Sequence, residues 1–300
     1  MRKVIIFALM VLFIIMSILS CQKKTETVVV DIKQGIDSVA SADGVNIVYE
    51  VSGTGSPALI MVHGWSCDRG YWREQVKEFS ADYTVVTVDL GGHGQSGLNR
   101  KTWCMHSYSE DVVAVVGKLG LDSVILIGHS MGGSVILEAA LRLKGKVIAL
   151  VGVDTFNDLT KKYTPEEMSA FLQPFEENFA NTTRLFVHSM FGPHADSALQ
   201  SEIINDMAAS PREVGLGSFE QYFPYYFGNP ISISMKKANL PVRCINSDKY
   251  ATNLEAGRAM AKSFEVKIMS GIGHFVHLED PVTFNRLLHE TLDELKVLKK

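Results

Sequence analysis

The stretch that decides the fold is Gly128-His129-Ser130-Met131-Gly132-Gly133. An apolar run, Val124 to Ile127, precedes it, and a helical pattern, Ser134 to Leu143, follows it. The sequence therefore predicts a buried strand, a tight turn and a helix in that order. The glycines on both sides of the serine allow the backbone to double back, because they carry no Cβ atom that would clash.

The predicted turn would make Ser130 a nucleophile. A serine at a sharp turn after a strand is raised out of the sheet, and a neighbouring base can then take its proton. The amide of Met131, at the start of the following helix, would point to where an oxyanion forms. The alternative is a chance glycine-rich turn, and the strand and helix on its two sides argue against it.

Composition and charge set the class of protein. The chain has 300 residues, of which 46% are hydrophobic and 21% are charged. Such a chain can bury one large core and carry an insertion. The formal net charge of -4 provides no positive field that would attract phosphate groups, so we expect no nucleic-acid partner.

Residues 1–21 have the pattern of an export signal. Two basic residues precede an apolar run, Val4 to Leu19, which stops just before Cys21. The ending Ile18-Leu19-Ser20-Cys21 resembles the lipobox of bacterial lipoproteins, which implies a lipid on Cys21 and a tether over 22–37. An uncleaved anchor is the alternative, since about 20 apolar residues span a bilayer. Both predict a protein of the bacterial cell envelope that contacts the lipid bilayer through its N-terminus.

Buried strands alternate with helices along the rest of the chain. The strands are expected at 58–62, 83–90, 124–127, 147–153, 242–245 and 264–269, with helical patterns at 71–79, 108–119 and 134–143 between the earlier ones. Ala42-Asp43-Gly44 indicates a hairpin before them. The alternation predicts an α/β fold with a mostly parallel, doubly wound sheet. Ligands bind at the carboxyl ends of the strands in such sheets.

The alternation stops at residues 155–240, so we expect a core of 38–154 and 241–300 with a helical lid inserted in it. The lid segment shows helical patterns at 165–179 and 183–191 and no convincing buried strand. It is rich in aromatic residues, and some of these would face the carboxyl ends of the strands. The expected substrate is therefore a small molecule with an uncharged, hydrophobic acyl or alcohol group.

The chain order of a serine, a later acid and a late histidine resembles the α/β-hydrolase fold family. His63-Gly64-Trp65 resembles the oxyanion loop of that family, Asp89 to Ser96 its glycine-rich turn, and Gly273 to Glu279 its histidine loop. The resemblance implies that His274 is the catalytic base. It also implies that the backbone amides of Trp65 and Met131 form the oxyanion hole.

Two assignments within this triad remain open. His277 is an alternative base, but in the family pattern the histidine directly after the glycine is the catalytic one. The family most often places its acid after the strand that follows the lid, which favours Asp248. Asp154, at the end of the strand before the lid, is the alternative acid. The acid holds the imidazole in the correct tautomer and stabilises the imidazolium.

The resemblance implies a serine hydrolase that cleaves a carboxylic ester or a related acyl bond through an acyl-enzyme, with no metal and no cofactor. An acyltransferase, a carbon-carbon bond hydrolase, a peptidase or a thioesterase could use the same triad. A non-catalytic binding protein could also have this scaffold. Of the remaining cysteines, Cys67 and Cys104 could form a disulfide in an exported protein, while Cys244 would stay unpaired. Small buried thiols are the alternative.

Overall fold

The computed structural model describes residues 32–298 of the chain. The predicted export signal 1–21, the predicted lipid attachment at Cys21 and most of the predicted tether 22–37 lie outside these residues. Within residues 32–298 no helix combines the length and the apolar composition that crossing a membrane requires.

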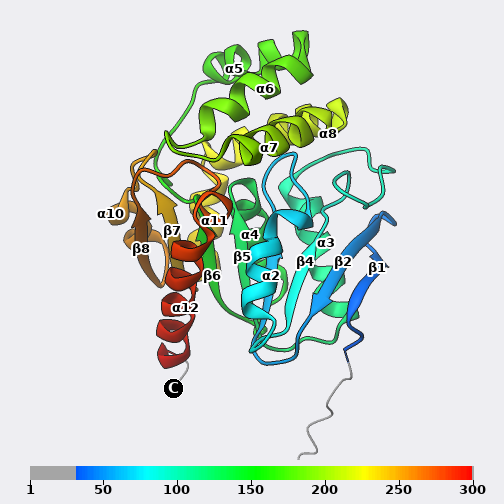
Figure 1. Ribbon diagram of the computed structural model, residues 1–300, viewed down its shortest axis with the longest axis vertical. Coiled ribbons are helices and arrows are strands. Elements are labelled where there is room, and N and C mark those ends of the chain that lie inside the picture. The colour runs from blue at the N-terminus through cyan, green and yellow to red at the C-terminus, as the bar shows by residue number, and fades with distance from the viewer. Residues whose placement is uncertain (1–31, 299–300) are drawn as a thin grey trace, which may run out of the picture. The chain divides into compact units, whose positions relative to one another are not determined.

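An eight-stranded sheet forms the centre of the fold (Figure 1), with the strand order β1-β2-β4-β3-β5-β6-β7-β8. The two pairings of β2, with β1 and with β4, are antiparallel, and every other pairing is parallel. The strands are β1 (Gly35–Ala40), β2 (Asn46–Ser52), β3 (Ala58–Val62), β4 (Val85–Val88), β5 (Val124–His129), β6 (Val147–Val153), β7 (Pro241–Ser247) and β8 (Ser263–Met269). The predicted mostly parallel sheet is confirmed.

Helices cover both faces of the sheet, as the continuous apolar strands require. Alternate residues of β3 enter two different cores: Ile60 packs in the core that contains α3 and α4, and Met61 in the core that contains α2 and α12. The flanking elements are η1 (Arg69–Trp72), α2 (Arg73–Phe79), α3 (Met105–Lys118), α4 (Met131–Arg142), α10 (Leu254–Met260), α11 (Val276–Glu279) and α12 (Pro281–Leu298).

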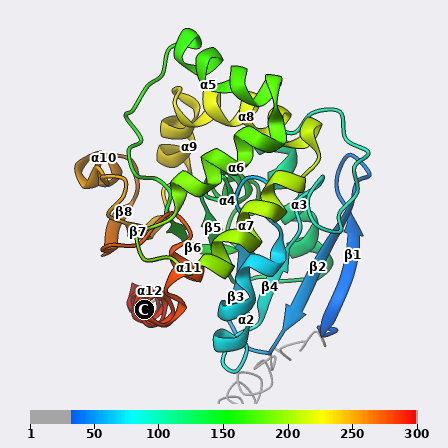
Figure 2. The ribbon, with the colours of Figure 1, turned by 45° about the horizontal axis from the view of Figure 1, so that its top comes forward.

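The segment between β6 and β7, here called the insertion, is helical. It contains α5 (Pro165–Glu177), α6 (Phe179–Met190), α7 (Ser197–Ala209), α8 (Arg212–Tyr226) and α9 (Pro230–Ala238). In Figures 1 and 2 these helices lie beyond the end of the sheet at which the parallel strands finish. The chain continues from α5 to α6 through Asn178, whose side chain accepts a hydrogen bond from Asn181 N at 3.2 Å. The insertion therefore covers the edge where parallel sheets bind ligands.

The N-terminal hairpin is confirmed, but its first strand is longer than predicted. β1 begins at Gly35, inside the predicted tether, and pairs with β2 from Gly35↔Val51 to Ala40↔Asn46. Gly44 has φ 83° in the connecting turn, a conformation that glycine adopts without strain. The core thus starts before residue 38.

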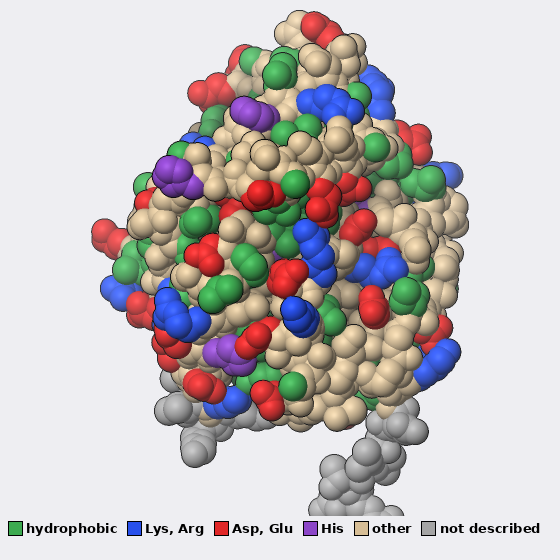
Figure 3. All heavy atoms as spheres, in the orientation of Figure 1, with side chains coloured by type: hydrophobic (Ala, Val, Ile, Leu, Met, Phe, Trp, Pro, Cys, Tyr) green, Lys and Arg blue, Asp and Glu red, His purple; other side chains and the backbone are tan. Residues whose placement is uncertain are grey.

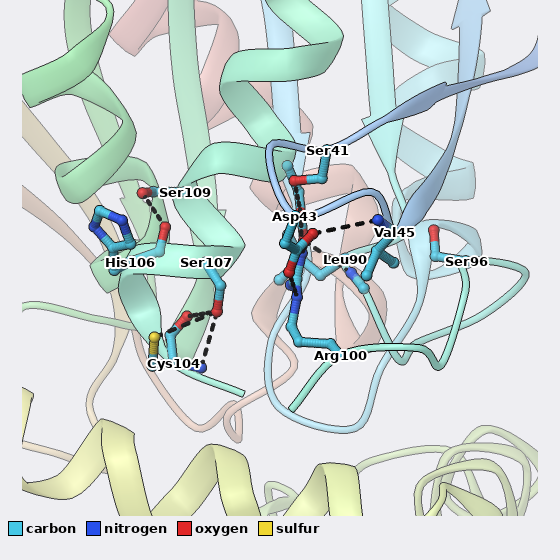
Figure 4. A network of polar contacts seen from close by, with 12 residues as sticks. Ser41, Asp43, Val45, Leu90, Ser96, Arg100, Cys104, His106, Ser107 and Ser109 are labelled. Atoms are coloured by element: carbon cyan, nitrogen blue, oxygen red, sulfur yellow. Dashed lines mark hydrogen bonds and ion pairs between the residues drawn. The ribbon is translucent and has the colours of Figure 1, made fainter. Parts of the chain in front are cut away.

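A buried ionic network fixes this hairpin to the sheet (Figure 4). Arg100 donates to Asp111 at 2.6 and 2.9 Å and to Asp43, in the hairpin turn, at 2.7 and 3.2 Å. Asp111, on α3, also accepts from the hydroxyl of Ser41 at 2.6 Å and from Gly91 N at 2.9 Å. The network joins the hairpin, α3 and the glycine-rich turn that follows β4. Outside such networks, acidic and basic side chains are interspersed on the face shown in Figure 3.

Candidate active site

Ser130 occupies the strained turn that the sequence predicts. It lies between β5 and α4 with φ 52° and ψ -119°, a left-handed backbone that non-glycine residues rarely adopt. Its amide donates to Val153 O at 3.0 Å, which fixes the turn to the end of β6. Such strain persists where the surrounding structure holds it, and here it raises the serine out of the sheet.

The glycines around Ser130 are required by close backbone contacts. A Cβ atom on Gly132 would lie 2.5 Å from Val62 O, and one on Gly128 would lie 2.5 Å from Gly132 O. A Cβ on Gly64 would lie 2.9 Å from the Nδ1 atom of His129 and 3.2 Å from the Cβ of Ser130. Side chains at these positions would push α4 and the predicted oxyanion loop away from the serine. The predicted reason for Gly128 and Gly132 is therefore confirmed.

The carboxylate beside His274 belongs to Asp154. The Nδ1 atom of His274 lies 2.5 Å from Oδ2 of Asp154. The other carboxylate oxygen accepts from Ser247 N at 2.8 Å and from the Ser247 hydroxyl at 3.0 Å. Asp154 is buried at 2% exposure and has φ 43°, so its own turn at the end of β6 aims the carboxylate at the imidazole.

The prediction that Asp248 lies beside the imidazole is wrong. Asp248 is exposed, and its carboxylate accepts from Gly271 N at 3.0 and 3.1 Å. Its backbone amide donates to Met269 O at 3.1 Å. The residue thus turns onto the loop that follows β8. Asp154 reaches His274 instead because the backbone turn at the end of β6, with φ 43° at Asp154, directs its carboxylate toward the imidazole.

His277 does not reach the site. Its ring is fully buried and packs against Trp72 at 4.6 Å and against His129 at 4.7 Å between ring centroids. Within residues 32–298 neither of its ring nitrogens has a hydrogen-bond partner. Burial lowers its pKa to about 3, so the ring is neutral near pH 7. The interpretation of His277 as a packing residue fits this position.

His129, directly before the nucleophile, supports the histidine loop. Its Nε2 atom lies 3.0 Å from the backbone oxygen of His274, and since a carbonyl only accepts, Nε2 carries the proton. Burial holds the pKa of His129 well below its ordinary value. The neutral ring therefore donates to the backbone of His274.

The loop that carries Trp65 is oriented by His63. The Nε2 atom of His63 accepts from Leu90 N at 3.1 Å, so Nδ1 carries the proton and donates to Gly64 O at 2.8 Å. A trans peptide points its carbonyl and its N–H in opposite directions, so the hydrogen bond to Gly64 O also fixes the direction of the Trp65 N–H. Within residues 32–298 the amides of Trp65 and Met131 donate no backbone hydrogen bond in a turn, loop or cap, as donors kept for a ligand would require.

The side chain of Trp65 joins this loop to the insertion. Its Nε1–H donates to Gly215 O, on α8, at 2.8 Å. Its ring stacks on Phe219 with centroids 4.0 Å apart and planes 11° apart. Phe175, Phe179 and Phe186 meet the same ring edge-on. The predicted oxyanion loop and the insertion therefore share one aromatic cluster.

Ser130, His274 and Asp154 line a cavity of about 610 Å³. Part of its wall comes from the insertion, which contributes many aromatic side chains: Tyr163, Phe171, Phe186, Phe219, Tyr222, Phe223, Tyr226 and Phe227. The charged side chains among its lining residues include Asp158, Lys161, Glu167 and Lys249. Such a lining fits a largely apolar small molecule.

Neither a disulfide nor a metal cluster is present within residues 32–298. Cys67, Cys104 and Cys244 are free thiols, so the predicted Cys67–Cys104 option is not formed. The Cys67 thiol donates to Trp65 O at 3.3 Å, and burial raises its pKa well above the ordinary value. No group of three or more histidine, cysteine, aspartate or glutamate side chains in the described part of the chain could hold a metal ion.

Comparison with known proteins agrees with this fold. The family model described as the alpha/beta hydrolase fold matches residues 57–281. The chain belongs to the α/β hydrolase fold family. Its site, where the serine at the turn after β5 lines one cavity with the bonded histidine and aspartate, is that of an esterase-like hydrolase of this fold.

Individual relatives are distant. The chain is 26% identical over 264 residues to the dihydrolipoyllysine-residue acetyltransferase component of the acetoin cleaving system of Cupriavidus necator, covering 84% of this chain and 68% of that protein. It is 30% identical over 152 residues to a pimeloyl-[acyl-carrier protein] methyl ester esterase of Vibrio atlanticus, covering 47% of this chain and 55% of that enzyme. A thermophilic esterase from Thermogutta terrifontis superimposes with a TM-score of 0.72 at 18% identity, over 87% of this chain and 98% of that one.

Proposed function

We propose that this protein hydrolyses a carboxylic ester or a related acyl bond of a small, largely apolar substrate. Ser130 is the nucleophile, His274 the general base, Asp154 the acid, and the amides of Trp65 and Met131 the oxyanion hole. The observation that carries the proposal is the 2.5 Å contact between His274 and Asp154, in a cavity that also contains Ser130.

The steps follow from the proton positions. Asp154 accepts a hydrogen bond from Nδ1–H and so keeps the proton on that nitrogen, which leaves Nε2 free to take the proton of the Ser130 hydroxyl. The serine oxygen attacks the carbonyl carbon, and the two amides bind the developing oxyanion. The imidazolium then gives its proton to the departing alcohol, and an acyl-serine remains. Water repeats the sequence: it loses a proton to Nε2, attacks the acyl carbon, and Ser130 recovers its proton as the acid leaves.

The insertion, in this proposal, is a lid that selects the substrate. Its aromatic residues form a large part of the cavity lining, so discrimination between substrates depends on apolar contact. One methylene group in such a pocket changes the relative rate by about 10- to 200-fold. We expect kcat/KM to rise with the length of the apolar group until the cavity is filled, and then to fall.

A fluorophosphonate probe tests the nucleophile directly. The probe should label the wild-type protein at Ser130 and leave Ser130→Ala unlabelled. A folded wild-type protein that the probe does not label would contradict the assignment and favour a non-catalytic binding protein. A series of esters of graded length, measured beside thioester, amide and lactone analogues, then identifies the bond that is cleaved.

The second part of the proposal concerns location. The export signal over 1–21 and the lipobox-like ending at Cys21 support a protein of the bacterial cell envelope, tethered to the lipid bilayer by a lipid on Cys21. Cys21→Ala should abolish incorporation of labelled fatty acid. If the uncleaved-anchor alternative holds, the variant should remain in the membrane fraction at the same size as the wild type.

A further inference from the structure

Glu279 binds both neighbours of the proposed base. The residue ends α11, and its carboxylate accepts from Gly273 N at 3.0 Å and from Phe275 N at 3.2 Å. The same carboxylate accepts from Gly192 N, on the insertion, at 2.9 Å. Hydrogen bonds from N–H groups to an ionised carboxylate are about twice as strong as neutral ones. One side chain therefore holds three backbone groups from two separate segments.

The end of α6 lies directly on the histidine loop. His274 N donates to Met190 O at 2.8 Å. A Cβ atom on Gly192 would lie 2.7 Å from Gly273 N, so the two backbones touch without space for a side chain. The rings of Phe191 and Phe275 pack beside this contact with centroids 5.0 Å apart.

We propose that Glu279 is a positioning residue that couples the insertion to His274; this rests on the proposed function. Met190 lines the cavity, and its carbonyl binds the amide of the base. A substrate that displaces the end of α6 therefore also pulls on His274. Glu279 holds both segments in the one arrangement that keeps His274 in the cavity with Ser130. A misplacement of about 1 Å at a catalytic group can cost about 100-fold in rate.

The first test is Glu279→Gln. The amide has the size of the carboxylate, but its NH₂ group cannot accept a hydrogen bond, so at least one of the three backbone donors loses its acceptor. We expect kcat to fall about 10- to 100-fold, while KM changes by less than about threefold because the cavity walls are unchanged. Glu220→Gln, an exposed position on α8 outside the cavity, is the matched control and should keep wild-type kinetics.

A second variant tests the coupling from the side of the insertion. Gly192→Ala keeps the Glu279 and His274 side chains but puts a methyl group 2.7 Å from Gly273 N and 3.0 Å from Oε2 of Glu279. We expect kcat to fall here as well, with a smaller change in KM. A folded Glu279→Gln protein with wild-type kcat overturns the proposal. If that variant does not fold, wild-type kcat in Gly192→Ala overturns it.

A measurement without substrate separates this inference from the proposed function. The proton between His274 and Asp154 should give a low-field NMR signal, which Asp154→Asn assigns by abolishing it. In Glu279→Gln we expect the signal to broaden or to exchange faster with water, because the loop around His274 is released. An unchanged signal contradicts the positioning role. A wild-type protein that shows the signal but cleaves no acyl bond contradicts the proposed function alone.

Discussion

Asp154 and His274 lie 120 positions apart in the chain, and their side chains meet at 2.5 Å between Oδ2 and Nδ1. The contact joins the end of β6 to the loop after β8, across β7. Ser247, at the end of β7, donates twice to the second oxygen of Asp154. The intervening strand thus supplies the support for the carboxylate rather than the carboxylate itself.

The first prediction concerns this carboxylate. Asp154→Asn should lower kcat by about 10⁴, as the loss of the tautomer-fixing acid does in serine proteases. Asp248→Asn is the matched control and should keep kcat within about twofold, since surface changes away from the site have small effects. Ester hydrolysis by the two purified variants measures both. A larger loss in the Asp248 variant would return the role to that residue.

The second prediction concerns the elbow. Gly132→Ala places a Cβ atom 2.5 Å from Val62 O and 2.6 Å from His63 O, so α4 must move away from β3. We expect a loss of about 1–3 kcal/mol in the free energy of unfolding together with slower labelling of Ser130 by a fluorophosphonate. Urea denaturation and labelling kinetics measure the two effects. Gly145→Ala is no control here because of its positive φ, whereas Gly117→Ala, with open space around it, is suitable and should leave labelling unchanged.

The third prediction concerns acid stability. The pKa of His277 is about 3 in the folded protein and about 6.5 in an unfolded chain. As the pH falls below about 6.5, the unfolded chain gains a proton that the folded one does not, so stability decreases down to about pH 3. His277→Phe removes this contribution and should flatten the dependence of the unfolding free energy on pH. An equally steep dependence in the variant would show that other groups, such as His129, dominate it.

The fourth prediction concerns the network in Figure 4. Arg100→Met leaves Asp111 buried without its ionic partner, and breaking a buried pair in this way costs about 3–5 kcal/mol. The double variant Arg100→Met with Asp111→Leu removes both charges and should recover part of that loss. Thermal unfolding of the single and double variants measures it. A double variant no more stable than the single one would mean that the hydrogen bonds of Asp111 to Ser41 and Gly91 matter more than its charge.

Much of the fold could be predicted because its signals are local. The apolar runs predict the strands β3, β5 and β6, and the glycines around Ser130 predict the tight turn. The alternation of strands and helices then predicts the sheet. Local patterns could not decide whether Asp154 or Asp248 is the acid that contacts His274. Asp154 and Asp248 both follow parallel strands, so both come to the same edge, and the backbone turn at Asp154, with φ 43°, decides which one reaches His274.

Glu279 shows a second limit of sequence reasoning. It stands five positions after His274, and nothing in its surroundings distinguishes it from a surface glutamate in a short helix. Its role depends on Gly192, which the insertion brings to it from far away in the chain. Contacts of this kind are set by how the segments pack. Gly192 and Gly273, whose backbones touch, carry no side chains, and this pair of glycines is the sequence feature that could have suggested the contact.

The bond from Trp65 to Gly215 and the stack on Phe219 bear on attempts to redesign this protein. One way to change the substrate preference of such a protein is to replace its insertion with the insertion of a relative. Here such a graft would also remove the partners that hold the Trp65 ring. A chimaera would therefore have to retain Gly215 and Phe219, or their equivalents, to keep its catalytic rate while its preference changes.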